Sequence, residues 1–413
     1  MPGFLLFVLI WAAVGAIVIG WMGRKILVAF WREPVLKRPV LIIESDDWGA
    51  GPPEQSERLE RIAAALASHV DRTGRKPVMT LGVVLGVADG ARILSGGCRH
   101  YHRKLLDQAE FASTLAAIKR GVERGVFALQ LHGEEHYWPP ALLAAERTVP
   151  SVATWLRSSQ PPRTEALPAP LQSRWVDARE LPSRSLRPDE IKTAALAEAA
   201  SFRKIFGKGP TVAVPPTFIW NEAVEIAWGE AGIQFVVTPG RRYIALDANG
   251  VPIAVGAPIV NGGRGAAGIT YLVRDDYFEP ARGHLAEDGL VALATKTRAG
   301  RPTLLETHRI NFLGDSAVAD AAIRELDRLF ALTLQTFPDV LFLSTEDLAS
   351  RMRRHDCQLV ERRFAIRLHL WLRRLWGISR LRRFACLTGV VVPAWLLYVS
   401  TWRRTGAPRS SSA

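Results

Sequence analysis

Residues 39–49 read Pro-Val-Leu-Ile-Ile-Glu-Ser-Asp-Asp-Trp-Gly, an apolar run that ends on two adjacent acids, Asp46 and Asp47. A continuous apolar run of this length is typical of a strand that is buried on both faces of a parallel sheet. Two carboxylates beside a core cost several kcal/mol when they have no partner. We therefore expect this pair to meet a metal ion, a base or a reacting group.

Further short apolar runs rich in β-branched residues predict a set of buried strands, at 40–43, 78–84, 126–131, 212–214, 235–237, 303–305 and 340–343. Helical patterns lie between them, at 54–68, 108–124, 189–206, 221–231 and 316–335. Strands that alternate with helices predict an α/β domain with a parallel sheet, either open or closed into a barrel. The proline-rich segment 137–187 breaks the alternation and is interpreted as a lid-like insertion, and the glycine-rich segment 241–274 as a small hairpin.

The composition is that of a globular protein, with 413 residues of which 48% are hydrophobic. The three cysteines have no CxxC spacing, so the sequence indicates neither a disulfide framework nor a thiolate metal site. The net charge of +13 is concentrated after residue 350, where fourteen arginines and two acids contribute +12. An almost neutral body with a basic tail argues against a nucleic-acid surface and for contact with anionic lipid.

Two uncharged segments predict membrane anchors, one in residues 1–23 and one in 384–402. A basic juxtamembrane linker, 24–37, follows the first. A cleaved signal peptide would carry basic residues before its apolar part, so a retained anchor is favoured. The positive-inside rule then places the body on the cytoplasmic side of an inner or plasma membrane.

Residues 351–383 are interpreted as a basic amphipathic helix on the membrane surface, because apolar residues recur there at helical spacing between arginines. The alternative is that this stripe packs on the protein's own core. Residues 403–413 are expected to be a disordered tail.

Polar clusters follow four of the predicted strands, where sites gather in parallel α/β domains. They are Asp46 with Asp47, the run from His132 to His136, residues 215–221 and residues 307–312. On a helical turn, the spacing of the two histidines brings both imidazoles to one face, and one carboxylate completes a metal site with open positions. Such a site suits non-haem iron or Zn²⁺-dependent hydrolysis, and the sequence contains no motif for an oxidant cofactor. The second aspartate is then free to act as a base.

These motifs resemble those of the polysaccharide deacetylase family, in particular the chitooligosaccharide deacetylase-like members of carbohydrate esterase family four, over residues 38–350. The resemblance implies a (β/α)7-type distorted barrel of parallel strands. It also implies that Asp46 is the base, that Asp47, His132 and His136 hold a divalent metal such as Zn²⁺, and that His308 is the general acid. Glu134 or Glu135 is expected either to orient a ligand histidine or to face solvent.

The chain departs from the family pattern in its third and fourth motifs. Residues 214–220 replace the usual Arg-x-Pro-Tyr, so the arginine that holds the base has to come from elsewhere, and Arg309, Arg274 and Arg242 are the candidates. The fourth motif is best matched by residues 274–277, which include Asp275. Trp48 and Trp220 either offer apolar faces to a sugar ring or pack in the core.

The leading hypothesis is a membrane-anchored, metal-dependent hydrolase that removes N-acetyl groups from a sugar or polysaccharide, including lipid-linked saccharide, in envelope polysaccharide metabolism. One alternative is a deacylase or deformylase of a non-polymeric amide. Another is a glycan-binding membrane scaffold without catalysis on a degenerate barrel. The sequence leaves the sugar, the metal and the oligomeric state open.

Overall fold

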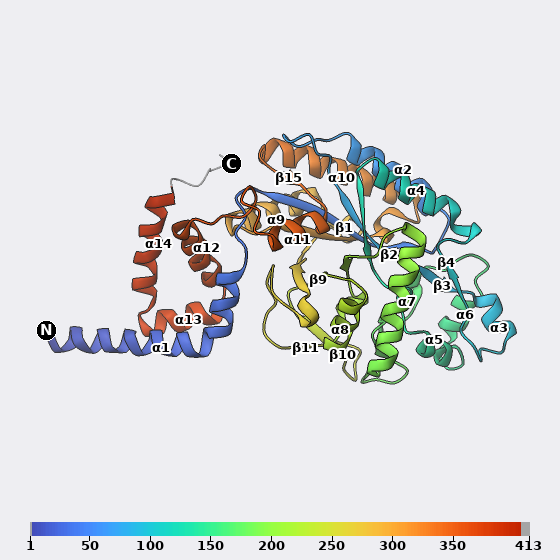
Figure 1. Ribbon diagram of the computed structural model, residues 1–413, viewed down its shortest axis with the longest axis horizontal. Coiled ribbons are helices and arrows are strands. Elements are labelled where there is room, and N and C mark those ends of the chain that lie inside the picture. The colour runs from blue at the N-terminus through green and yellow to red at the C-terminus, as the bar shows by residue number, and fades with distance from the viewer. Residues whose placement is uncertain (1, 406–413) are drawn as a thin grey trace.

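The computed structural model describes residues 2–405, and Figure 1 shows a small group of helices beside a larger α/β domain. The small group, which we call the helical module, contains α1 (Pro2–Arg32), α12 (Phe364–Trp376), α13 (Ser379–Thr388) and α14 (Val391–Thr405). The expected disordered tail, 403–413, lies mostly outside the described residues, and its first residues belong to α14.

The α/β domain is built on one sheet, and every strand pair recorded within it is parallel. Its strands are β1 (Val40–Gly49), β2 (Met79–Val84), β5 (Phe127–Leu131), β8 (Val212–Ala213), β9 (Phe235–Thr238), β12 (Thr270–Val273), β13 (Asp276–Tyr277), β14 (Thr303–His308) and β15 (Leu341–Phe342). All seven predicted strand positions are occupied. The pair β12 and β13 falls where the sequence predicted no strand of this sheet.

The two end strands of the sheet are consecutive in the sequence, and the short connection between them closes the sheet into a barrel. The hydrogen-bonded order is β12-β9-β8-β5-β2-β1-β14-β13, so β12 and β13 stand at its two ends. Only Arg274 and Asp275 separate these two strands in the sequence. If β12 and β13 count as one bent strand and β15 as an addition beside β1, the nine strands of this sheet within the described residues reduce to seven around a circle. The predicted (β/α)7-type distorted barrel is confirmed.

Amphipathic helices cover the outside of the barrel: α2 (Gln55–Ala67), α4 (Ala112–Glu123), α7 (Pro188–Phe206), α8 (Glu222–Glu230), α9 (Ala286–Arg298), α10 (Ser316–Thr336) and α11 (Thr345–Arg353). Helix α10 begins after Asp315, whose side chain accepts hydrogen bonds from two backbone N–H groups of the first turn. It buries residues at a spacing of three to four, among them Leu326, Leu329 and Phe330. Each such side chain contributes about 1.5–3 kcal/mol of apolar burial.

The insertion 137–187 is more ordered than its composition predicted. It contains α5 (Pro139–Glu146), α6 (Pro150–Leu156) and a short hairpin of β6 (Val176–Asp177) and β7 (Arg184–Ser185). Arg163 of the insertion pairs with Glu54 after β1, and Glu165 pairs with Arg309 after β14. The insertion therefore extends across the end of the barrel at which the strands finish. The expected small hairpin in 241–274 is present as β10 (Arg242–Leu246) and β11 (Pro252–Val255).

The helical module corrects three expected boundaries. Helix α1 continues to Arg32, so most of the expected linker 24–37 is helical. Residues 351–383 are not one helix, because α11, α12 and α13 share this range. The expected membrane-crossing helix over 384–402 is broken at Gly389, which has a φ of 73°, and α13 and α14 meet there at 111°. The positive φ ends α13 in the left-handed conformation that glycine adopts without strain.

One helix of the described residues is by itself long and apolar enough to cross a membrane, the part of α1 from Ile10 to Arg32. Only 11% of its most apolar stretch is buried against the rest of the protein.

Candidate metal centre

A bulge in β1 turns both adjacent acids toward the end of the barrel. In a regular strand, consecutive side chains point to opposite faces. The pairing of β1 with β2 shifts register between Ser45 and Trp48, and Asp47 has a φ of 75°, which non-glycine residues rarely adopt. Asp46 consequently points into the barrel and Asp47 turns toward the loop after β5. The strained backbone is therefore what brings two carboxylates into one site.

The histidine motif follows β5 as an irregular loop, and the expected helical turn is absent. Gly133 has a φ of 98°, and a Cβ there would lie 2.7 Å from the Glu135 carbonyl oxygen. This tight turn brings the Nε2 atoms of His132 and His136 to 3.1 Å from each other. The Nδ1 of His132 lies 2.9 Å from the Val214 carbonyl oxygen. A carbonyl oxygen can only accept a hydrogen bond, so Nδ1 carries the proton and donates it. In the neutral ring, the lone pair therefore sits on Nε2, where it faces the aspartate.

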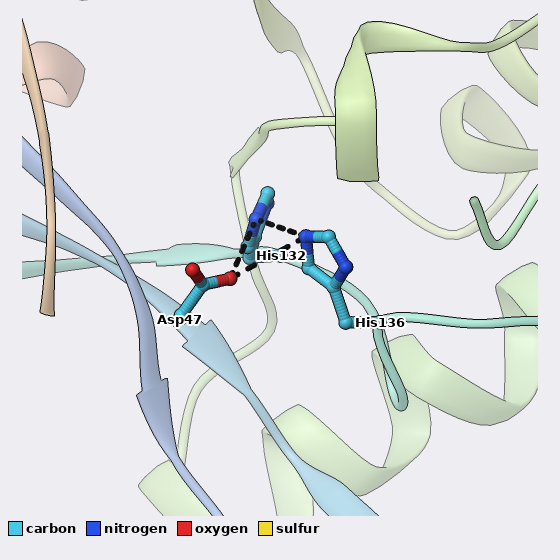
Figure 2. A group of neighbouring side chains, drawn as sticks. All are labelled: Asp47, His132 and His136. Atoms are coloured by element: carbon cyan, nitrogen blue, oxygen red, sulfur yellow. Dashed lines mark hydrogen bonds and ion pairs between the residues drawn. The ribbon is translucent and has the colours of Figure 1, made fainter. Parts of the chain in front are cut away.

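Figure 2 shows Asp47, His132 and His136 directed at one point. The Oδ1 of Asp47 lies 3.5 Å from His132 Nε2 and 3.4 Å from His136 Nε2. All three side chains are buried, their ligand atoms lie within 4.8 Å of one another, and Asp47 Oδ1 has no hydrogen-bond partner. A buried carboxylate oxygen that faces two imidazole nitrogens fits a divalent cation, because each of the three groups can offer a lone pair.

The pKa shifts of two of the three ligands agree with a cation site. For the third, His132, burial lowers the pKa, but Asp46 and Asp47 outweigh it and raise the pKa, so a cation has to displace a proton from that ring. Burial raises the pKa of Asp47, but His136 and His132 outweigh it and hold the pKa well below its usual range. Burial lowers the pKa of His136 to about 4, despite the opposing charge of Asp47. His136 is thus neutral and Asp47 ionised at neutral pH, which are the protonation states that metal ligands require.

Asp46 is held from inside the barrel by Arg274, which occupies the two-residue connection between β12 and β13. The Nη2 of Arg274 lies 2.5 Å from Asp46 Oδ2, and its Nη1 lies 2.9 Å from Glu44 Oε2. Its Nε lies 3.2 Å from Glu306. Burial raises the pKa of Asp46, but Arg274 and His132 outweigh it and lower the pKa, whereas burial raises the pKa of both Glu44 and Glu306. The guanidinium therefore keeps Asp46 ionised, and Asp46 Oδ1 stays without a partner.

His308 ends β14, next to Asp46 in the register of the sheet. Its Nδ1 lies 2.5 Å from Glu279 Oε1, and the other oxygen of Glu279 accepts a hydrogen bond from Asn311 at 2.6 Å. Burial lowers the pKa of His308, but the hydrogen bond with Glu279 and the charges of Asp47 and Asp46 outweigh it and raise the pKa to about 9. His308 is therefore a cation at neutral pH.

Of the three arginines considered as a partner for Asp46, only Arg274 contacts it. Arg242 pairs with Glu225, and Arg309 pairs with Glu165 of the insertion. Arg309 nevertheless lies near the site. Burial lowers its pKa, Glu165 outweighs burial and raises the pKa, and the charge of Asp47 raises it further.

Three other predicted support residues lie outside the site. Trp48 and Trp220 are both 0% exposed, so neither offers a face to a substrate. Trp48 donates to Ser45 Oγ, and Trp220 donates to Glu225. Asp275 is exposed and pairs with Lys296, so it does not support His308. The two tryptophans therefore pack in the core, and the acid beside His308 is Glu279, four residues after the predicted Asp275.

The two glutamates inside the histidine motif neither orient a ligand nor face solvent. Glu135 is buried between Arg103, at 2.6 Å, and Arg174, also at 2.6 Å. Glu134 pairs with Arg103 at 3.0 Å and accepts a hydrogen bond from Ser201. Both residues therefore fix the loop that carries His132 and His136.

Sequence reasoning missed Glu44, Glu306 and Glu279. The first two had a signal, because Glu44 stands two residues before Asp46 and Glu306 two before His308, and strand residues two apart share a face. The sequence signal for Glu279 was weaker, because it consists only of an acid that follows the aromatic pair Tyr277 and Phe278.

No protein-family profile matches the sequence, and no curated protein matches it. Solved structures that match include a peptidoglycan deacetylase from Bacillus subtilis, with 13% identity over 77% of this chain and 93% of that one and a TM-score of 0.35. A family 4 acetyl xylan esterase from Clostridium thermocellum, in complex with cobalt, has 14% identity over 75% and 90% and a TM-score of 0.35.

A 4-alpha-glucanotransferase from Thermococcus litoralis also matches, with 8% identity over 76% of this chain and a TM-score of 0.40. The chain spans 40% of that protein's length. The matches thus include members of the family that the motifs resemble. At TM-scores this low the likeness carries no argument about activity, which has to rest on the geometry of the site.

Proposed function

We propose that the protein is a metal-dependent amide hydrolase that removes N-acetyl groups from a sugar or polysaccharide. The observation that carries the proposal is the pair of buried, unpartnered oxygens, Asp46 Oδ1 and Asp47 Oδ1, beside two facing imidazoles and a protonated His308. This set contains a cation site, a base and an acid at one end of the barrel.

Asp47, His132 and His136 would hold the metal, for which we propose Zn²⁺. When bound, such a cation polarises the acyl carbonyl and lowers the pKa of water. Asp46 accepts the proton of the attacking water on its free Oδ1, while Arg274 keeps the other oxygen in place. His308 donates a proton from Nε2 to the departing amine, because Glu279 occupies Nδ1.

In place of the arginine that the third motif lacks, we propose Arg274, which contacts Asp46 from the connection between β12 and β13. This contact favours an enzyme over a degenerate barrel that binds glycan without catalysis, because it supplies the one part of the catalytic set that the sequence left unassigned.

The test is acetate release by the detergent-solubilised full chain, supplied with Zn²⁺ and a panel of N-acetylated saccharides. We expect release by the wild-type protein and a loss of at least a hundredfold in Asp46→Asn, since general-base catalysis contributes about 10²–10⁴. Asp275→Asn is the matched control, because Asp275 is an exposed aspartate near Arg274 that does not contact the site. Absence of release from the wild-type protein across the whole panel would refute the proposal.

We also propose that the helical module anchors the barrel to the cytoplasmic face of the membrane and contacts anionic lipid. Arg24, Lys25 and Arg32 follow the apolar part of α1, and α13 exposes Arg380, Arg382 and Arg383. The positive-inside rule supports this side. A topology reporter inserted within residues 160–165 tests it, and an extracytoplasmic signal from that reporter would overturn the assignment.

A further inference from the structure

The helical module is fixed to the barrel through a buried arginine. Arg374 of α12 donates hydrogen bonds of 2.8–3.0 Å to four carbonyl oxygens, those of Glu33, Pro34, Ala299 and Gly300. Its side chain is 0% exposed, and it also pairs with the Glu33 carboxylate at 3.3 Å. A guanidinium buried against four carbonyls is costly to withdraw, because its removal takes a hydrogen-bond donor from each of these buried carbonyls.

Further contacts at the same place exclude a flexible hinge. Glu33, directly after α1, forms a bidentate pair with Arg301 at 2.8 and 2.9 Å. Leu36 donates to the Gly300 carbonyl at 2.8 Å and forms a β-bridge with Val360. A Cβ on Gly300 would lie 2.9 Å from Leu370 and from Val35, so the two parts are also in close van der Waals contact.

This junction lies at the opposite end of the barrel from the metal centre. Leu36 precedes β1, and Gly300 and Arg301 precede β14, so the module meets the ends at which the parallel strands begin. Asp47 and His308 stand where the same two strands finish. At about 3.3 Å per residue, the path from the start of β1 to Asp47 places the site about 23 Å beyond the junction.

The apolar surface that suits contact with lipid lies on the side of the helical module that faces away from the barrel. Large apolar side chains along α1 are exposed, namely Phe7, Ile10, Trp11, Val14, Ile17, Trp21 and Met22, and α13 and α14 add Leu387, which is 77% exposed, and Trp395. Figure 1 shows the N-terminal part of α1 and helix α14 at the end of the molecule away from the barrel.

A basic belt separates this apolar part from the barrel. Leu381 of α13 packs on Gly23 of α1, and Thr388 packs on Gly15. The exposed arginines around Leu381 therefore lie level with Arg24 and Lys25, at the end of the apolar stretch of α1. Arginine and lysine at this level match the head groups of anionic lipid.

From these observations we infer that the mouth of the barrel faces away from the bilayer. The substrate is then an N-acetylated glycan chain that extends well beyond the membrane surface, or a saccharide free in solution, and not a sugar attached directly to a lipid head group. The inference rests on the proposed deacetylase function for its substrate class, whereas the orientation itself is independent of catalysis.

The orientation is tested with single fluorophores on the full chain in vesicles that contain head-group quencher lipids. Cys357 reports on the junction, because its carbonyl accepts a hydrogen bond from Lys37 before β1, and Cys386 reports on the module. Ile310→Cys, made in a background with all three native cysteines changed to serine, reports on the mouth next to His308. We expect strong quenching at Cys386 and Cys357 and none at position 310. Quenching at position 310 equal to that at Cys357, or none at Cys386, would overturn the inference.

The substrate class is tested with one N-acetylated oligosaccharide in three forms: free, attached directly to a lipid in the same vesicles, and attached through a long flexible spacer. We expect the direct conjugate to be deacetylated at least tenfold more slowly than the spacer conjugate, and the free saccharide to be a substrate. Equal or faster turnover of the direct conjugate would refute the inference and leave the deacetylase proposal intact. Absence of turnover of all three forms, with the expected quenching pattern, would refute the deacetylase proposal alone.

Discussion

Glu279→Gln separates the role of His308 as an acid from its place in the fold. The substitution keeps the shape of the side chain and removes the charge that faces His308 Nδ1 at 2.5 Å. The amide oxygen can still accept the hydrogen bond from the ring, whereas the amide nitrogen, a donor, replaces the oxygen that accepts from Asn311. What changes is the stability of the protonated imidazole.

The size of the effect follows from the pKa of His308. A rise from 6.5 to about 9 corresponds to about 3 kcal/mol in favour of the charged ring. Glu279 is the largest of the contributions that raise the pKa, ahead of Asp47 and Asp46. We expect its neutralisation to lower the pKa by about one unit or more, within the range of about 1–3 units that one adjacent opposite charge produces.

The assay is the pH profile of kcat/KM for acetate release at saturating metal, together with an NMR titration of the His308 ring. The alkaline limb of the profile belongs to the acid, so in Glu279→Gln it has to move toward lower pH by the same amount as the ring titration. Asp275→Asn is the control and leaves both unchanged. An alkaline limb that stays in place while the ring pKa falls would show that His308 is not the proton donor.

Three further predictions address the metal, the barrel interior and the anchor. Wild-type protein and Asp46→Asn should each retain about one equivalent of Zn²⁺ after dialysis, whereas Asp47→Asn should retain far less, as measured by elemental analysis; equal metal content in all three would contradict the assigned ligands. Arg274→Met should lower the free energy of unfolding by about 3–5 kcal/mol in urea titrations, because it removes the buried guanidinium that pairs with Asp46, Glu44 and Glu306. The part-exposed Arg242→Met should cost clearly less, and a similar loss in both would argue against a special role for Arg274. We expect α13 and α14, which meet at 111°, to form a re-entrant segment and not a span, so a topology reporter after residue 408 should lie on the same side of the membrane as one within 160–165; opposite sides would show that they form a span.

His308 also links stability to pH. Its pKa in the folded protein is raised above the unfolded value of 6.5, so the charged ring stabilises the fold fully below about pH 6.5. This contribution is lost as the pH rises through about 9. The difference in unfolding free energy between wild type and Glu279→Gln should therefore shrink between these two pH values, and a constant difference would show that the substitution acts on packing and not on the charge of His308.

The barrel strands were predictable because burial on both faces leaves a continuous apolar run, as in 40–43 and 303–305. The strand formed by β12 and β13 escaped prediction because Arg274, Asp275 and Asp276 interrupt it. A charged interruption normally indicates a loop, and here it is tolerated because the carboxylates of β1 and β14 receive the arginine inside the barrel. The expected number of seven strands was thus reached with β15 in place of β12 and β13.

The candidate site residues were predictable from order along the chain, since the two acids and His308 stand at the ends of β1 and β14 and the two histidines follow β5. Their supports were not, because they depend on which strands become neighbours around the circle. Arg274 reaches Asp46 only through closure of the barrel, and Glu279 reaches His308 only because β13 pairs with β14. The single helix expected over 384–402 failed for a local reason, a glycine whose positive φ the hydropathy of the segment does not reveal.

The position of Arg274 makes Asp46, the proposed base, a reporter of complete folding. The barrel circle is completed by the short covalent connection between β12 and β13, and the arginine of that connection is the residue that keeps Asp46 ionised. A chain in which β1, β2 and β5 have paired but β13 has not docked on β14 already holds Asp47 near both histidines, yet its Asp46 lacks the guanidinium. Under the proposed mechanism, such an intermediate would hold the metal ligands together without an ionised base, so we expect activity to appear only after β13 has docked on β14.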